Sequence, residues 1–325
     1  MSEVYLKIYR GYANLNSVEV FGHVIRNKNL ESNSFEHNRW KYAFYMIRMF
    51  MIKPLSNIEV NFNFNGVQSS TTTMSDGFYH FSVPLHKPLS PGWHRFEVSV
   101  NWGDEKITGT EEFFMSFPGE YGFISDIDDT FLISHSSNFF KKLFVLLTNN
   151  IHRRKIFEDV VEHYRLLSKA SRIHDEGSNL FFYVSSSEWN LYSFIDKFTA
   201  LHGFPKAIIK LKKIKKGLGD FLLTGRGNHD HKFEKIAAIL NFYPGVSFTL
   251  LGDDSQKDPF IYQKIVQEFP DRIKAIYIRQ TKIEKRQEAV KILSEIKKFN
   301  VACCYFKDSL EAIRHSEKIG LLEFS

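Results

Sequence analysis

The most restrictive feature of this sequence is a regular alternation of short apolar runs and helical segments after residue 120. The apolar runs read as buried strands at 121–125, 180–184, 207–211, 246–251, 275–278 and 301–306. The segments between them have helical spacing at 157–167, 189–200, 232–240, 259–268 and 284–298. This alternation predicts an α/β fold, in which helices cover both faces of a parallel sheet. Ligands of such sheets bind at the carboxyl ends of the strands.

The first 118 residues have a different pattern, dominated by period-two alternation. Strands are expected at 18–24, 57–65, 78–83 and 96–102, and a helix at 40–51. No cluster of catalytic residue types accompanies them. We therefore expect a small β-sandwich-like accessory domain with one helix at 1–118 and a catalytic domain at 119–325, with Pro118-Gly119 as the boundary.

The composition favours anionic partners but does not choose among them. The net charge of +6 and pI of about 9.0 favour phosphate esters, anionic lipid or nucleic acid. Cys303 and Cys304 are adjacent on a predicted strand and point to opposite faces, so a disulfide between them is not expected. The N-terminus lacks a signal-peptide core, and no apolar run is long enough to span a membrane. These features predict a cytoplasmic protein with, at most, peripheral membrane contact.

Polar clusters follow three of the predicted strands and open one helix. They are Asp126 and Asp128, the run Ser185-Ser186-Ser187, the pair Asp253-Asp254, and Lys232. Singly, each has an ordinary structural explanation, such as an acidic turn, a capping turn or a solvated lysine. Because strand ends converge at one edge of an open sheet, the four together predict a single site.

The residue types suit phosphoryl transfer. Asp126 can attack phosphorus to form an aspartyl-phosphate, and Asp128 can protonate the leaving oxygen and later activate water. Ser185 and Lys232 can contact the phosphate. Mg²⁺ prefers oxygen ligands, which the carboxylates of Asp126 and Asp253 and the main-chain carbonyl of Asp128 can supply.

Taken together, these motifs resemble those of a known superfamily. Asp126-Ile127-Asp128-Asp129-Thr130, Ser185, Lys232 and Gly252–Asp258 resemble the four motifs of the haloacid dehalogenase superfamily. Within it, 120–280 resembles the actin-patch phosphatidate phosphatase family and its bacterial relatives. The resemblance implies a Rossmann-like core, Mg²⁺ dependence and a lipid phosphate substrate. It also implies the nucleophile, acid/base and phosphate-contact roles given above. Asp258 would be a further metal partner, and the resemblance assigns no role to Asp254.

Substrate selection is expected outside these motifs. Ser186 is a further candidate for substrate binding. The apolar segment 139–147 either contacts an acyl chain or membrane, or forms a buried cap helix. Arg153, Arg154 and Lys155 either bind a head group or form a solvated turn. The lysine run at 206–216 either contacts anionic lipid or is a solvated loop.

Two other functions stay open at this point. One is hydrolysis of a soluble phosphomonoester, such as a nucleotide or inositol phosphate. The other is a catalytically retired membrane or protein adaptor, which the intact acidic set disfavours. Nucleic acid is not expected, since no recognised binding module accompanies the lysines. Protein partners and oligomeric state do not follow from the sequence.

Overall fold

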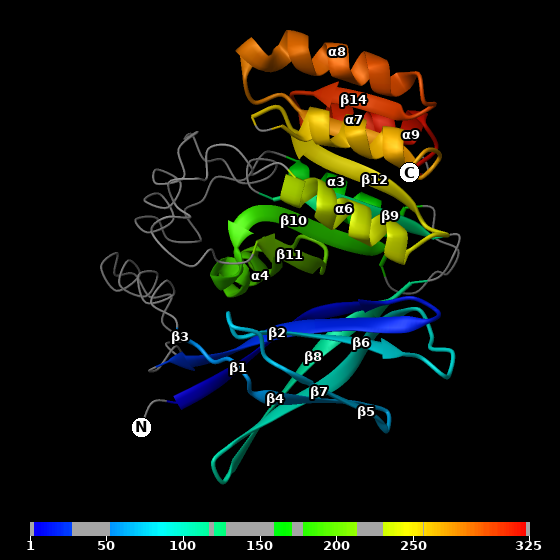
Figure 1. Cartoon of the computed structure of the whole chain (residues 1–325). Helices are drawn as coiled ribbons and strands as arrows, with labels where there is room; N and C mark the ends of the chain where they lie inside the picture. Colours follow the sequence, from blue (N-terminus) through cyan, green and yellow to red (C-terminus); the bar gives the residue numbers. More distant parts are fainter. Residues whose placement is uncertain are drawn as a thin grey trace. The chain divides into compact units, whose positions relative to one another are not determined.

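The computed structural model describes most of the chain in two compact units. The described residues are 3–27, 53–116, 120–127, 159–170, 178–212, 230–255 and 257–322. Those up to residue 116 belong to the first unit, and those from residue 120 belong to the second. Each unit contains its own sheet (Figure 1).

The described part of the first unit is built from one mixed sheet. Its strands are β1 (Glu3–Ala13), β2 (Ser17–Asn27), β3 (Lys53–Pro54), β4 (Glu59–Phe64), β5 (Val67–Thr72), β6 (Phe78–Pro84), β7 (Gly92–Trp102) and β8 (Glu105–Met115). The order is β3-β2-β1-β8-β7-β4-β5, with β6 paired to β2. The β1–β8 pairing is parallel and the others are antiparallel. The four predicted strands are present, whereas the predicted helix at 40–51 lies outside the described residues.

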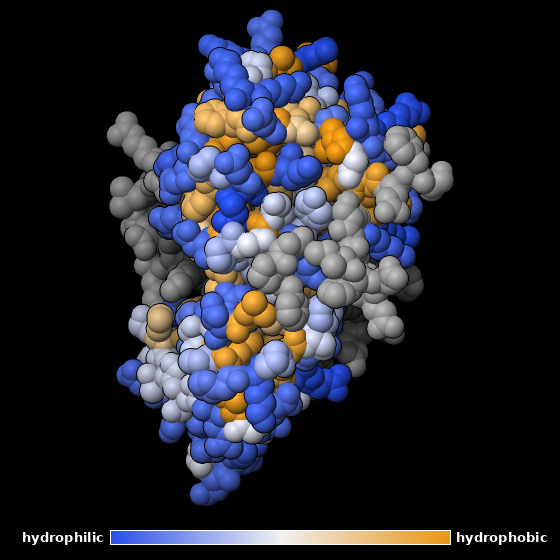
Figure 2. Space-filling view, turned by 90° about the vertical axis from the view of Figure 1, so that its right-hand side faces the viewer, coloured by the Kyte–Doolittle hydropathy of each residue, from blue (hydrophilic) through white to orange (hydrophobic). Residues whose placement is uncertain are grey.

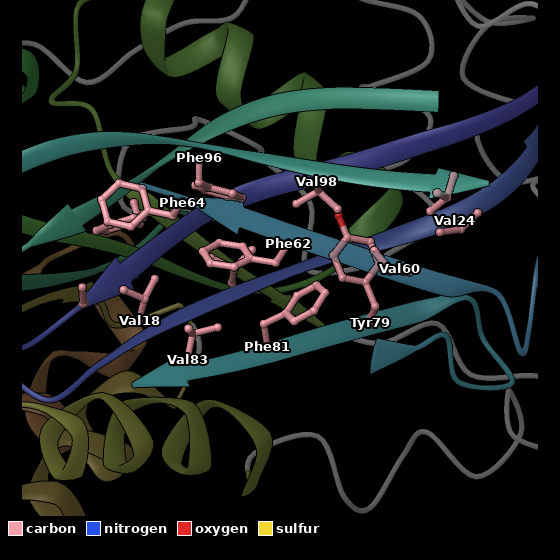
Figure 3. Packing of buried hydrophobic residues seen from close by; sticks show 14 of the residues in the cluster. Val18, Val24, Val60, Phe62, Phe64, Tyr79, Phe81, Val83, Phe96 and Val98 are labelled. Atoms are coloured by element: carbon pink, nitrogen blue, oxygen red, sulfur yellow. The ribbon is translucent and has the colours of Figure 1, made fainter. Parts of the chain in front are cut away.

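The apolar side chains of the alternating pattern form the core of this unit. In β4 every second side chain is buried, and these side chains pack against those of β6 and β7 (Figure 3). Phe62 contacts Phe81 and Phe96 with ring centroids 5.7 and 5.6 Å apart. Each fully buried phenylalanine contributes about 2 kcal/mol of hydrophobic stabilisation. This core holds no cluster of catalytic side chains among the residues that the structure describes.

The second unit contains a six-stranded parallel sheet. Its strands are β9 (Tyr121–Asp126), β10 (Leu180–Glu188), β11 (Ile208–Lys212), β12 (Ser247–Asp253), β13 (Ile273–Arg279) and β14 (Ala302–Phe306). All of them overlap the predicted runs. The order is β11-β10-β9-β12-β13-β14, and every pairing is parallel. The chain therefore adds β10 and β11 on one side of β9, and then β12, β13 and β14 on the other side.

Helices connect these strands and pack on the sheet. The described helices are α3 (Val160–Lys169), α4 (Tyr192–Leu201), α6 (Asp230–Phe242), α7 (Asp258–Glu268), α8 (Arg286–Lys297) and α9 (Ser309–Lys318), with short 3-10 turns η2 (Trp189–Leu191) and η3 (Ile283–Lys285). The helices α6, α7 and α8 lie side by side along the sheet, while α3 packs against α9 (Figure 1). Helix α9 was not predicted from the sequence.

A buried polar network joins α3 and α9 to β13. The Tyr277 hydroxyl lies 2.6 Å from Ser316 Oγ, and His163 Nε2 lies 3.1 Å from the same oxygen. Burial lowers the pKa of His163 to about 3, with further lowering by the charges of Arg279 and His315. His163 is therefore neutral in the folded protein at neutral pH.

The structure also describes the two adjacent cysteines. Cys303 and Cys304 are buried and form no disulfide, and burial raises their pKa values to about 11 and about 12. Both thiols therefore stay protonated at neutral pH.

Among the described segments, no helix is long and apolar enough to cross a bilayer.

Candidate active site

The candidate site lies where the strand order of the parallel sheet reverses. β9 ends at Asp126, β12 ends at Asp253, and the two strands pair in register with Ser125 opposite Leu251. Asp126 and Gly252 are the next residues along the two strands. Sheets of this type bind ligands outside the carboxyl ends of the strands at such a reversal point. The two aspartates predicted to act together therefore end adjacent strands at this position.

Gly252 leaves the space that this site needs. A Cβ atom on Gly252 would meet Asp258 Oδ2 at 2.5 Å and the Tyr262 hydroxyl oxygen at 2.8 Å. Both belong to α7, and the Tyr262 hydroxyl donates to the Leu251 carbonyl at 2.8 Å. Burial holds the pKa of Tyr262 well above its ordinary value, so the phenol stays protonated and can donate. Glycine at 252 thus lets the start of α7 approach the end of β12.

Lys232, in the first turn of α6, links two carboxylates at this point. Its ammonium lies 3.1 Å from Asp126 Oδ1 and also donates to Asp258 Oδ1. All three side chains are nearly inaccessible to solvent, with 4% exposure for lysine and 0% for each carboxylate. Charges this deeply buried are tolerated only when they are paired. The cation therefore holds Asp126 and Asp258 near each other.

The Asp258 carboxylate is also fixed from the strand side. Asp258 Oδ2 accepts from the Asp253 backbone N–H at 3.3 Å, and Asp258 is the first residue of α7. A carboxylate at this end of a helix is stabilised by the helix dipole. These contacts make Asp258 a partner that orients Lys232, while its expected metal role stays a prediction.

Asp253 lies in register with Arg279 on β13. Its Oδ1 accepts from the Ser255 backbone N–H at 2.6 Å, which closes a tight turn after the strand. Arg279 donates to the Lys307 carbonyl at 3.2 Å and to Ser309 Oγ. Burial lowers the pKa of Arg279 to about 10, so it remains a cation beside Asp253 at neutral pH.

The serines 185–187, predicted to follow a strand, lie in the last part of β10 and have different roles. Ser185 is completely buried, and its Oγ accepts from the Ser187 backbone N–H at 2.8 Å. Its carbonyl accepts from Lys235 Nζ at 2.8 Å. Ser186 is half-buried. Because β9 pairs with β10, with Asp126 opposite Val184, Ser185 belongs to the same edge of the sheet as Asp126.

Asp254 has a distinct function from its neighbour. Its Oδ1 accepts from the Thr281 backbone N–H at 2.8 Å, Thr281 Oγ1 at 2.6 Å and the Lys282 backbone N–H at 3.1 Å. Its Oδ2 accepts from the Tyr305 hydroxyl at 2.6 Å. This buried carboxylate therefore ties the loop after β13, and the strand β14, to the end of β12.

Sequence reasoning missed two buried residues near the site. The Tyr164 hydroxyl lies 2.6 Å from Ser125 Oγ, and burial raises the pKa of this phenol. The other is Arg279, a polar residue directly after the apolar run 275–278. The strand-end rule that identified Asp126 and Asp253 would have identified Arg279, whereas no sequence signal marks Tyr164.

Several predicted site residues lie outside the described residues. They are Asp128, Arg153, Arg154 and Lys155, the apolar segment 139–147, and Lys213, Lys215 and Lys216 of the lysine run. Lys206, Lys210 and Lys212 are described and are partly exposed. Within the described ranges, no three His, Cys, Asp or Glu side chains form a group that could hold a metal ion.

Comparison with known proteins finds a match to the region of the chain that contains this site. Residues 121–280 match the family model described as phosphatidate phosphatase APP1, catalytic domain. This segment is similar to a phosphatase catalytic domain. A curated relative, phosphatidate phosphatase APP1 of Saccharomyces cerevisiae, is 30% identical over 170 residues, which is 50% of this chain and 27% of the yeast protein. The chain thus spans about a quarter of that relative's length.

Comparison of the whole chain with solved structures gives weak likeness only. A carbohydrate acetylesterase from Xanthomonas citri is 9% identical with a TM-score of 0.35, covering 98% of this chain and 75% of that one. A β-glucuronidase from Parabacteroides merdae is 10% identical with a TM-score of 0.32, covering 93% and 40%.

Proposed function

We propose that this protein is a Mg²⁺-dependent phosphatase that hydrolyses a lipid phosphomonoester such as phosphatidate. The observation that carries the proposal is the buried set Asp126, Lys232 and Asp258 at the reversal point of the sheet. The set lies inside the segment that matches a phosphatidate phosphatase catalytic domain. We further propose that the second unit has a haloacid dehalogenase-like fold, which its strand order and motif positions support.

In the proposed reaction, Asp126 is the nucleophile. One carboxylate oxygen attacks phosphorus, and the bond from phosphorus to the alcohol oxygen breaks. Asp128 donates a proton to that leaving oxygen. The same group then takes a proton from water as the water attacks the aspartyl-phosphate, which releases inorganic phosphate and regenerates Asp126.

Lys232 performs two tasks in this scheme. Its ammonium already lies 3.1 Å from the nucleophile, and it can attract a phosphate oxygen as the phosphate approaches. Asp258 holds the ammonium in this position, because the lysine donates to it from a fully buried site. Ser185 is proposed to donate its hydroxyl to a second phosphate oxygen.

The available donors fit Mg²⁺ chemically. Asp126 and Asp253 supply carboxylates from adjacent strand ends, and the Asp128 carbonyl is the proposed third ligand. When bound, Mg²⁺ would offset the repulsion between the anionic nucleophile and the anionic phosphate. The protein residues themselves orient the nucleophile and move the proton.

The test is phosphate release from phosphatidate and from soluble phosphomonoesters by wild type and Asp126→Asn. The amide is nearly the same shape but is a poor nucleophile, so activity should fall at least about 100-fold. Asp271→Asn is the matched control, because Asp271 is exposed and has a positive φ of 63° that asparagine also adopts. Phosphate release by Asp126→Asn within tenfold of wild type would refute the nucleophile. A clear preference for a soluble ester would refute the lipid substrate alone.

A further inference from the structure

Two segments on the carboxyl edge of the parallel sheet, the start of α7 and the region of the 3-10 turn η3, expose apolar side chains among cations. The six residues of this basic-apolar rim are Lys257, Phe260, Lys282, Ile283, Lys285 and Arg286. Ile283 is 84% exposed and Phe260 is 43% exposed. Exposed apolar side chains are common on protein surfaces, and Figure 2 shows several hydrophobic patches among hydrophilic residues. The position of the exposed side chains must therefore decide whether they have a function.

The position of the rim is set by the sheet. Lys257 and Phe260 follow β12, while Lys282 and Ile283 follow β13, and these strands are parallel neighbours. Both segments therefore lie on the edge that carries Asp126 and Asp253. The exposed Leu201 is instead the last residue of α4, and the exposed Phe299 lies just after α8; both helices return the chain to the opposite edge.

The rim is also fixed to the catalytic strand. Asp254 accepts from the backbone N–H groups of Thr281 and Lys282 at 2.8 and 3.1 Å, and it directly follows Asp253. Ile283 is the next residue after this anchored pair. The rim thus keeps a defined position relative to the proposed catalytic carboxylates.

The charges around the rim are mostly positive. The two segments contain four cations, and their neighbours in sequence include two exposed carboxylates, Glu284 and Glu288. Lys285 pairs with Glu288 at 3.1 Å, but a pair this exposed contributes little and is easily exchanged. An apolar side chain flanked by basic groups suits the boundary of an anionic bilayer, because the apolar part enters the acyl region while the cations stay at the head groups.

We propose that the basic-apolar rim docks the protein on an anionic bilayer surface, so that the catalytic edge faces the lipid head groups. This proposal rests on the proposed lipid phosphatase function and names the surface that delivers the substrate. It is separate from the lysine run at 206–216. Lipid hydrolysis should depend on the rim, whereas hydrolysis of a small soluble ester should not.

The test is sedimentation of the full-length protein with vesicles of phosphatidylcholine alone or mixed with phosphatidylglycerol. Phosphatidylglycerol is anionic but is a phosphodiester, so binding is measured without turnover. Phe260→Ser/Ile283→Ser and Lys282→Gln/Lys285→Gln/Arg286→Gln should each lower binding to the anionic vesicles at least about fivefold. Leu201→Ser/Phe299→Ser is the matched control and should bind as wild type does.

The outcomes separate this proposal from the phosphatase assignment. Both rim variants should release phosphate from a soluble phosphomonoester within about twofold of wild type, which also shows that they are folded. Equal vesicle binding by the rim variants and wild type, or no vesicle binding by wild type, would overturn the docking proposal. Absence of phosphate release by wild type from every ester would instead overturn the enzyme function and leave the vesicle result standing.

Discussion

At the scale of single residues, the candidate site depends on side chains that are far apart in sequence. Asp126 and Lys232 approach to 3.1 Å across a separation that contains two strands and two α-helices of the described chain. The residue types were predictable because each follows a strand or opens a helix. The pairing of Lys232 with Asp258 was not, because it depends on the packing of α6 beside α7.

Asp253 gives the first prediction at this scale. Asp253→Asn removes one anionic oxygen from the proposed Mg²⁺ ligands, so the Mg²⁺ concentration needed for half-maximal activity should rise at least about tenfold. Phosphate release is measured across a Mg²⁺ titration, and EDTA should silence the wild type. Full wild-type activity in excess EDTA would exclude the metal-assisted mechanism.

Gly252 gives the second prediction at the residue scale. In Gly252→Ala, the new Cβ must displace Asp258 or Tyr262, so the free energy of unfolding should fall by about 1–3 kcal/mol and activity should decrease. Gly109→Ala in the first unit is the control, since the single close contact of its Cβ would be with Ile8 Cδ1, the flexible end of a side chain, at 2.8 Å. Urea unfolding and phosphate release measure both effects. Wild-type stability and activity in Gly252→Ala would show that α7 is not packed as described.

At the scale of elements, the strands of the second unit were predicted to within a few residues because they are continuous apolar runs. The helix α9 was not predicted, because its charged surface leaves only a few buried positions, including Ala312 and Ser316. Nor could sequence show that Tyr305 of β14 reaches Asp254, 51 residues away. In the first unit, the parallel β1–β8 pair is likewise a long-range contact that local patterns do not encode.

The interface of α3 and α9 with β13 predicts a dependence of stability on pH. His163 has a folded pKa of about 3 against 6.5 when unfolded, so the unfolded state binds the proton more readily. Stability should therefore fall as pH drops below 6.5, by roughly 2 kcal/mol at pH 5 from this residue.

Urea unfolding at pH 7 and pH 5 measures this effect. His163→Phe keeps a ring against Tyr277 but cannot be protonated, so the difference between the two pH values should shrink by about that amount. An identical pH dependence in wild type and His163→Phe would show that protonation of His163 does not govern acid stability.

At the scale of the whole molecule, the described catalytic candidates all belong to the second unit. A fragment of residues 119–325 should therefore hydrolyse a small soluble phosphomonoester at a rate within about tenfold of the full chain, since no proposed ligand or nucleophile is removed. Phosphate release is compared with that of the same fragment carrying Asp126→Asn. A folded fragment without activity would show that residues 1–118 contribute to catalysis.

The central position of β9 in its sheet has a consequence for synthesis of the chain. β9 is the first strand of its unit to leave the ribosome, yet its second neighbour, β12, emerges only after β10, β11 and α6. Until then one edge of β9 exposes unpaired backbone groups. A nascent chain that stalls before Ser247 therefore exposes a strand edge that can pair with another chain. Chaperones that cover such edges are then needed to prevent its aggregation.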